Sequence, residues 1–123
     1  MISQEIEKIR EVVQRYIDAT YEADIPALRS CFHKEARMTG FLGDQLLIGT
    51  PEPFFQDMAS TPSMKSNGDP YNAIICSLSS TGRIGYAVVL ETGFRGSGVI
   101  ENHFQLIYDE GKWSIISKNF TTI

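Results

Sequence analysis

The chain has 123 residues, 42% of them hydrophobic and 21% charged, which suits a single soluble globular domain over residues 1–123. Its 11 basic and 15 acidic residues give a formal net charge of −4, and no run of Lys and Arg forms a basic patch, so nucleic acid is an unfavourable partner. No apolar stretch approaches the ~20 residues that a membrane-spanning helix needs, and the charged start MISQEIEKIREVV differs from a signal peptide, so we expect a cytoplasmic protein without membrane contact.

The first quarter of the chain predicts two helices. Apolar residues recur at helical spacing from about residue 3 to residue 22, which is typical of an amphipathic helix. The apolar stripe consists of Ile2, Ile6, Ile9, Val13, Tyr16, Ile17 and Thr20. Asp24 then suits an N-cap and Pro26 a first helical turn, so a second and shorter helix should follow, with Phe32 as its last apolar residue.

The rest of the chain predicts one more helix and a sheet. TPEPFFQDM (50–58) has the pattern of a short helix with Thr50 as its cap and Pro51 at its first position. The strand-like segments are 36–42, 44–49, 71–80, 83–92, 98–108 and 112–120, and residues 60–70 form the one long loop. This order predicts an α+β domain in which the helices pack on one face of a mainly antiparallel sheet.

The last two predicted strands are apolar on both faces. Under strict alternation, Trp113 and Ile115 oppose Ile116 and Phe120. A sheet with one wet face should alternate more cleanly, so the outer face needs a second cover. A homodimer through the outer sheet face, with Trp113 and Ile115 near the contact, is one explanation, and a monomer with scattered surface apolar residues is the other.

The two cysteines and one of the two histidines are residue types that can bind a metal. Cys31 and Cys76 stand far apart, without a CxxC motif, so we expect two reduced and mostly buried thiols. His103 shares a predicted outward strand face with Glu101 and Gln105, and metal binding there would need two more ligands. No metal and no cofactor is expected.

Two stretches resemble the nuclear transport factor 2-like superfamily. They are RYIDATYEADIPALRSCFHKEARMTG (15–40) and NHFQLIYDEGKWSIISKNF (102–120), with the paired signals Asp24…Phe32-His33-x-x-Ala36 and Asp109-x-Gly111-x-Trp113. Within the superfamily, the chain is most similar to the small proteins labelled lumazine-binding, which are related to SnoaL-like polyketide cyclases and ketosteroid isomerase-like proteins. The resemblance implies a cone-shaped barrel, in which a strongly curved sheet wraps over the long N-terminal helix and two shorter helices and encloses an apolar pocket. It also implies homodimers through the outer sheet face.

The resemblance further implies where an isomerase of this fold carries its catalytic groups. Tyr16 matches the hydrogen-bond donor on the first helix. The general-base position falls on Thr39-Gly40, where no carboxylate exists, and the second acid falls near Asn102 to Phe104, again without an acid on the apolar face. Losing a general base alone lowers a rate by roughly 10²–10⁴. We therefore assign no catalytic residue.

His33 stands where the second helix is predicted to end. It could be a catalytic base, or it could bind the last helix carbonyls in a turn. No Ser or Cys nucleophile stands at a recognisable spacing from it, and the matching histidine of the superfamily recurs in non-catalytic members. The structural role is our interpretation.

Six residues are candidates for lining a ligand pocket: Tyr16, Met38, Met58, Asn102, Phe104 and Lys118. Tyr16 is either a core tyrosine whose hydroxyl binds the backbone or a donor that faces the ligand. Met38 and Met58 either line the pocket mouth or fill the core.

Lys118 is the least expected of these residues. If the alternation holds, it points inward together with Ile116 and Phe120, and burial would lower its pKa. A twist or bulge near Ser117 would instead turn it out to solvent. An inward Lys118, together with Asn102 and the Tyr16 hydroxyl, would suit an anionic or carbonyl-bearing compound.

The function we expect is binding of a small apolar or heterocyclic molecule in an apolar pocket between the sheet and the helices. The alternative is an enzyme of the isomerase, cyclase or dehydratase type that acts on an apolar carbonyl compound. A dimeric interaction module is the third hypothesis. The missing acid at residues 38–40 favours binding over catalysis, and the lack of further domains favours it over the interaction module.

Overall fold

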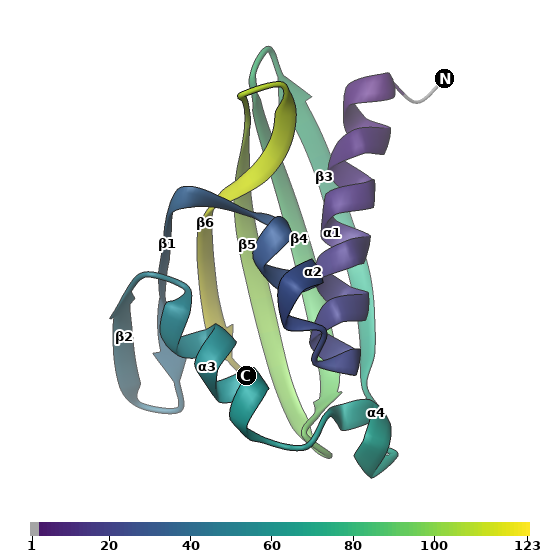
Figure 1. Cartoon of the computed structure of the whole chain (residues 1–123), viewed down its shortest axis with the longest axis vertical. Coiled ribbons are helices and arrows are strands. Elements are labelled where there is room, and N and C mark those ends of the chain that lie inside the picture. The colour runs from purple at the N-terminus through teal and green to yellow at the C-terminus, as the bar shows by residue number, and fades with distance from the viewer. Residues whose placement is uncertain (1–2) are drawn as a thin grey trace.

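The computed structural model describes residues 3–123, so Ile2 of the predicted stripe lies outside the described residues. Its helices are α1 (Gln4–Glu22), α2 (Ile25–Ser30), α3 (Glu52–Ser60) and α4 (Met64–Asn67). Its strands are β1 (Phe32–Leu42), β2 (Gln45–Gly49), β3 (Asn72–Thr81), β4 (Ile84–Phe94), β5 (Gly98–Asp109) and β6 (Lys112–Thr122). The helices lie on one side of the sheet, which confirms the predicted α+β architecture (Figure 1).

The first two helices begin where capping residues satisfy their free N–H groups. The Ser3 hydroxyl accepts the Ile6 N–H at 3.1 Å and starts α1, and the Asp24 carboxylate accepts the Ala27 N–H at 3.2 Å and starts α2. Between the two helices, Ala23 adopts a left-handed conformation with φ 54° and turns the chain. The buried face of α1 consists of Ile9, Val12, Val13, Tyr16, Ile17, Ala19 and Thr20.

The six strands form one sheet in the order β2-β1-β6-β5-β4-β3. Only the β1–β6 pair is parallel, so the sheet is mainly antiparallel as expected. The edge strands β2 and β3 do not pair with each other within the described residues, so the curved sheet stays open instead of closing into a full barrel. Its concave face carries α1 and the core.

A β-bulge in β6 corrects the predicted strand faces. Gln105 pairs with Ser117 while Leu106 pairs with Ile115, which leaves Ile116 as the extra residue. Trp113 and Ile115 therefore point to the same concave side as Lys118, and both are buried in the core. The placement of Trp113 and Ile115 at an outer contact was wrong, and so was the inward placement of Ile116.

Three smaller expectations also change. The segment predicted as a loop contains α4, whose cap Ser63 accepts the Ser66 N–H at 3.0 Å. The α3 helix begins after Pro51, one residue later than predicted, although the Thr50 hydroxyl accepts the Glu52 N–H at 3.4 Å. Both cysteines are free, and Cys31 is buried as expected, whereas Cys76 is exposed at the register shift of β3.

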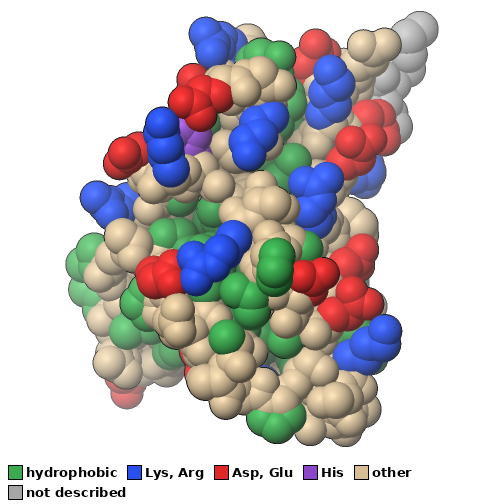
Figure 2. Space-filling model, in the orientation of Figure 1, with side chains coloured by type: hydrophobic (Ala, Val, Ile, Leu, Met, Phe, Trp, Pro, Cys, Tyr) green, Lys and Arg blue, Asp and Glu red, His purple; other side chains and the backbone are tan. Residues whose placement is uncertain are grey.

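The surface that carries the helices mixes both signs of charge. Lys and Arg side chains alternate there with Asp and Glu, and no large basic area forms on this face (Figure 2). This distribution offers a nucleic acid no basic surface on the face in view. None of the helices described between residues 3 and 123 has the length and apolar character needed to cross a membrane.

Candidate functional site

Three neighbouring strands direct a polar side chain into the concave core. Glu91 lies on β4, Asn102 on β5 and Lys118 on β6, and these side chains are 1%, 0% and 5% exposed. The strand register makes Asn102 the diagonal neighbour of both charged residues, because Glu91 pairs with Ile100 and Lys118 pairs with Phe104. An acid, an amide and an amine thus lie side by side beneath α1, in a mainly apolar interior that also buries Thr20 and Ser114.

Lys118 has an unusual environment for a lysine. Its Nζ donates to the Tyr16 hydroxyl at 2.6 Å and lies 4.2 Å from the ring centroid of Phe54 and 5.3 Å from that of Phe120. No carboxylate among residues 3–123 forms a direct ion pair with it. Burial lowers the pKa of Lys118 to about 8, and the charge of Glu91 partly opposes that shift. The ammonium is therefore held by one hydroxyl and by cation–π contacts.

Tyr16 is the second polar group of the site. Its side chain is 1% exposed and meets the Phe104 ring edge-on, with the ring centroids 4.9 Å apart. Burial, followed by the negative charge of Glu91, raises the pKa of Tyr16 well above 10. The phenol is therefore neutral at any physiological pH. Its oxygen accepts a hydrogen bond from Lys118 Nζ and none from the backbone of residues 3–123, and the neighbouring Thr20 side chain partly opposes the rise in its pKa.

Glu91 is the residue that the sequence reasoning missed. Its carboxylate accepts the Tyr71 hydroxyl at 2.6 Å and the Asn102 amide. Burial and the nearby Glu91 charge raise the pKa of Tyr71, so Tyr71 remains a donor. The signal was present, because strict alternation along β4 places Glu91 on the same inner face as Ala87 and Val89.

Asn102 has one polar atom left over. Its amide nitrogen binds Glu91, but its Oδ1 finds no hydrogen-bond partner within the described part of the chain. A buried acceptor without a donor costs on the order of 1–3 kcal/mol. A ligand N–H or O–H that reached this oxygen would remove the penalty.

The structure brings most of the six predicted pocket residues together. Tyr16, Asn102, Phe104 and Lys118 share the concave face, and Met38 joins them on β1, opposite Lys118 in the parallel register. Met58 lies on α3, is 2% exposed and belongs to the same core as Tyr16 and Phe104, and its sulfur is 3.6 Å from Arg95 Nη2. The ring centroids of Tyr16, Phe54 and Phe120 lie 5.0, 4.2 and 5.3 Å from Lys118 Nζ, and Lys118 is 5% exposed, so these side chains close the site around the amine.

The position that would carry the general base of an isomerase is Gly40, and the structure leaves no room there for a larger side chain. Gly40 has no side chain, and a Cβ at this position would overlap the backbone and ring of Phe120. A carboxylate therefore cannot stand at residue 40 without displacing β6. The carboxylate of this site is instead that of Glu91 on β4.

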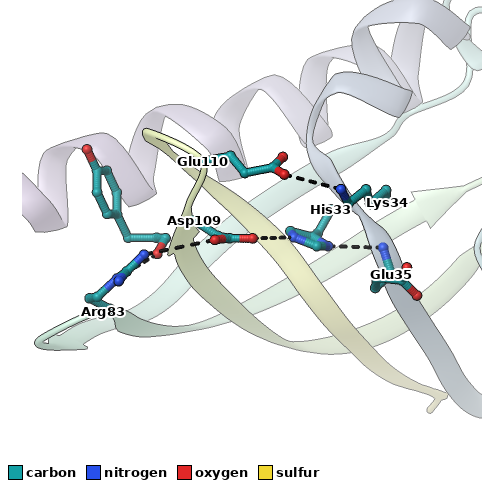
Figure 3. A network of polar contacts seen from close by, with 7 residues as sticks. His33, Lys34, Glu35, Arg83, Asp109 and Glu110 are labelled. Carbon is teal, nitrogen blue, oxygen red and sulfur yellow. Dashed lines mark hydrogen bonds and ion pairs between the residues drawn. The ribbon is translucent and has the colours of Figure 1, made fainter.

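His33 is not a helix cap but the second residue of β1. Its Nδ1 accepts the Glu35 N–H at 3.0 Å, so its ring proton lies on Nε2 and points to the Asp109 carboxylate at 2.9 Å (Figure 3). The adjacent His33 holds the pKa of Asp109 below its usual range. Both ring nitrogens are engaged, which supports the structural interpretation. This bond joins the two sequence signals that carried the resemblance, on β1 and at the β5–β6 turn.

His103 lies on the convex face and is also bonded on both sides. Its Nδ1 is 2.7 Å from the Tyr86 hydroxyl and its Nε2 is 2.7 Å from the Glu101 carboxylate. The imidazole is 42% exposed, in agreement with the outward position predicted for it.

Comparison with known proteins places this arrangement in a family. The family model described as "Putative lumazine-binding" matches residues 4–121. The chain belongs to this family. No curated protein matches the sequence.

Several solved structures have the same fold as this chain. An NTF2-like protein of unknown function from Methylobacillus flagellatus has a TM-score of 0.86 and 22% identity, over 100% of this chain and 95% of that chain. One from Silicibacter pomeroyi has a TM-score of 0.86 and 23% identity, over 100% of both chains. A ketosteroid isomerase-like protein from Erwinia carotovora atroseptica has a TM-score of 0.71 and 16% identity, over 99% and 98%. These likenesses establish an NTF2-like fold.

Proposed function

We propose that the chain binds a small, largely apolar molecule through a carbonyl or carboxylate oxygen, with Lys118 and Tyr16 as the polar contacts. The observation that carries the proposal is the buried Lys118 amine, which has one hydroxyl partner and no direct ion pair within residues 3–123. Binding sites in proteins commonly combine apolar walls with a few convergent polar groups of this kind. The rings of Phe54 and Phe120 supply such walls.

The family description supports a heterocyclic ligand in particular. Lumazine is a flat bicyclic ring system with two carbonyl oxygens, so a molecule of this type could place an oxygen on Lys118 and its face against an aromatic ring. Asn102 Oδ1 would accept a ring N–H. Because the site is closed, entry requires the half-buried Phe54 on α3 to move away from Lys118.

Thermal-shift measurements with lumazine and with a set of apolar ketones and carboxylates test this proposal. Binding to the native state raises the melting temperature of the wild type by mass action. Lys118→Met should abolish the shift, whereas Lys65→Met, which changes an exposed lysine, should leave it unchanged. An equal shift in wild type and Lys118→Met would contradict the proposal.

A second candidate function is proton transfer on a bound carbonyl compound. The observation in its favour is Glu91, a buried carboxylate with two neutral donors in the same interior as Lys118 and Tyr16. A carboxylate base next to a hydroxyl donor is the combination that enolisation needs. Deuterium exchange at the α-carbon of a bound ketone, measured by NMR, should then depend on Glu91 and disappear in Glu91→Gln.

A further inference from the structure

Lys118 differs from every other lysine of the chain. The other lysines are exposed, and they are Lys8, Lys34, Lys65 and Lys112. Two of them also form ion pairs, Lys34 with Glu110 and Lys65 with Glu22. Lys118 alone combines burial with an aromatic enclosure and a hydroxyl partner.

We propose that Lys118 is a nucleophile that forms an imine with an aldehyde or ketone bound on the concave face. This inference rests on the proposed function, because it requires a carbonyl carbon at the position where the binding proposal places a carbonyl oxygen. It goes further in assigning a covalent step and in restricting the ligand to aldehydes and ketones, since carboxylates do not form imines under these conditions.

The protonation state of the amine favours this chemistry. A pKa of about 8, against an ordinary value of 10.5, leaves roughly one amine in ten neutral at pH 7. An exposed lysine has roughly 300-fold less neutral amine at the same pH. Desolvation of lysine in an apolar pocket is a recognised way of activating it as a nucleophile.

Imine formation at Lys118 proceeds through a carbinolamine. The lone pair of Lys118 Nζ attacks the carbonyl carbon, the C=O π bond opens, and the oxygen takes up a proton to give a carbinolamine. Loss of that hydroxyl as water, with one proton, breaks the C–O bond and leaves a protonated imine. Nitrogen gives up one proton when the carbinolamine forms, and the leaving hydroxyl takes up one, so the net change is amine plus carbonyl plus one proton to protonated imine plus water, and nothing is oxidised or reduced.

Tyr16 and the aromatic rings stabilise the charged species along this path. The neutral Tyr16 hydroxyl, 2.6 Å from Nζ, can donate to the carbinolamine oxygen as it forms. The protonated imine is a cation in the position of the former ammonium, facing the rings of Phe54 and Phe120. The charge of Glu91, which already favours a cation at Lys118, favours the iminium for the same reason.

Reductive trapping tests the inference on the full chain. The protein is incubated at pH 7.5 with acetaldehyde or benzaldehyde and sodium cyanoborohydride, and peptide mapping by mass spectrometry follows each lysine. We expect Lys118 to be alkylated at least ten times faster than Lys8 or Lys112. In Tyr16→Phe, alkylation of Lys118 should slow by roughly 10²-fold, the low end for loss of an acid catalyst. Lys118→Arg should lose the fast phase and keep the slow labelling of exposed lysines.

The same samples separate failure of the inference from failure of the proposed function. If the aldehydes raise the melting temperature in a Lys118-dependent manner but Lys118 is labelled no faster than Lys8, the imine is excluded and noncovalent binding stands. If the aldehydes give neither a shift nor fast labelling, the imine is overturned, and the thermal shifts with lumazine, ketones and carboxylates alone decide the proposed function. If Lys118 is labelled at the same fast rate in Tyr16→Phe as in the wild type, Tyr16 takes no part in imine formation.

Discussion

At the scale of single residues, the site is defined by a buried base and a buried acid that do not touch. Each is satisfied by neutral partners, Lys118 by Tyr16 and Glu91 by Tyr71 and Asn102. Buried ionic groups held in this way are weak contributors to stability, because the loss of hydration offsets most of what the contacts contribute. These two buried groups are the basis of the proposed binding function.

Lys118 makes the stability of the protein depend on pH. Its folded-state pKa lies below the unfolded value of 10.5, so its unfavourable contribution is fully present below about pH 8 and disappears as pH rises towards 10.5. The change amounts to about 3 kcal/mol for a shift of this size. Lys118→Met should therefore be more stable than wild type at pH 7, and the difference should shrink by pH 9.5. Urea unfolding followed by Trp113 fluorescence checks this, and a difference that does not vary with pH would show that Lys118 is hydrated in the native state.

Glu91 should raise the pKa of the Lys118 amine from β4, two strands away in the sheet. Because its charge raises the pKa of Lys118 against the larger effect of burial, Glu91→Gln should lower that pKa further. The pH midpoint of Lys118 reductive alkylation should move to lower pH in Glu91→Gln. Glu101→Gln, on the convex face, is the matched control and should leave the midpoint in place. An unchanged midpoint in Glu91→Gln would mean that the two charges are uncoupled.

At the scale of elements, two features position the site. The bulge at Ile116 allows β6 to bury Trp113 under α1 and still direct Lys118 inward. The His33–Asp109 bond ties the start of β1 to the β5–β6 turn, where Glu110 and Gly111 adopt left-handed conformations with φ 54° and 78° (Figure 3). The first sets the faces of β6, and the second fixes its register beside β1.

Removing the His33 side chain should loosen this junction without affecting the ligand site. His33→Ala loses the bonds to Asp109 and Glu35, so we expect a destabilisation of roughly 1–2 kcal/mol in urea unfolding. Lys34→Ala removes an adjacent but exposed ion pair with Glu110 and should have no measurable effect. A His33→Ala variant that keeps full stability but loses the ligand-dependent thermal shift would point to a functional histidine.

The sequence predicted the elements well, because their signals are local. Asp24 and Ser63 act as caps, and the stripe of α1 has a clean helical period, although Ser63 was overlooked since a single turn shows no periodicity. The bulge at Ile116 could not be predicted, because an extra residue in a strand depends on pairing with β5 and not on its own composition. Regular alternation predicts the inward position of Asn102 on β5, and the same alternation along β4 places Glu91 inward beside Ala87 and Val89.

At the scale of the whole molecule, the curved sheet leaves its convex face uncovered. A groove of about 280 Å³ on this face is lined by residues of β3, β4, β5 and β6, which include the apolar Ile84, Tyr86, Ile107 and Ile116 and the polar Ser79, Ser80, Thr81 and Gln105. Ile84 is 61% exposed, which is high for a large apolar residue of a central strand. Trp113 and Ile115 belong to the core, so a contact between copies through the convex face would use this other set of residues.

We therefore expect a homodimer through the convex face. Light scattering at micromolar concentration should give about twice the chain mass, because burial of such a patch favours self-association. Ile84→Lys should shift the protein towards a monomer, whereas Ile48→Lys, on the edge strand β2, should not. A monomer across the whole concentration range of the wild type would exclude the dimer.

The central claim is that Lys118 receives a carbonyl or carboxylate ligand on the concave face. Native mass spectrometry of the wild type and Lys118→Met, each equilibrated with the same set of lumazine, apolar ketones, aldehydes and carboxylates, tests it most directly. Our account predicts at least one compound retained by the wild type in a one-to-one complex per chain and absent from Lys118→Met. Retention of the same compounds by both proteins, or of none by either, would contradict it.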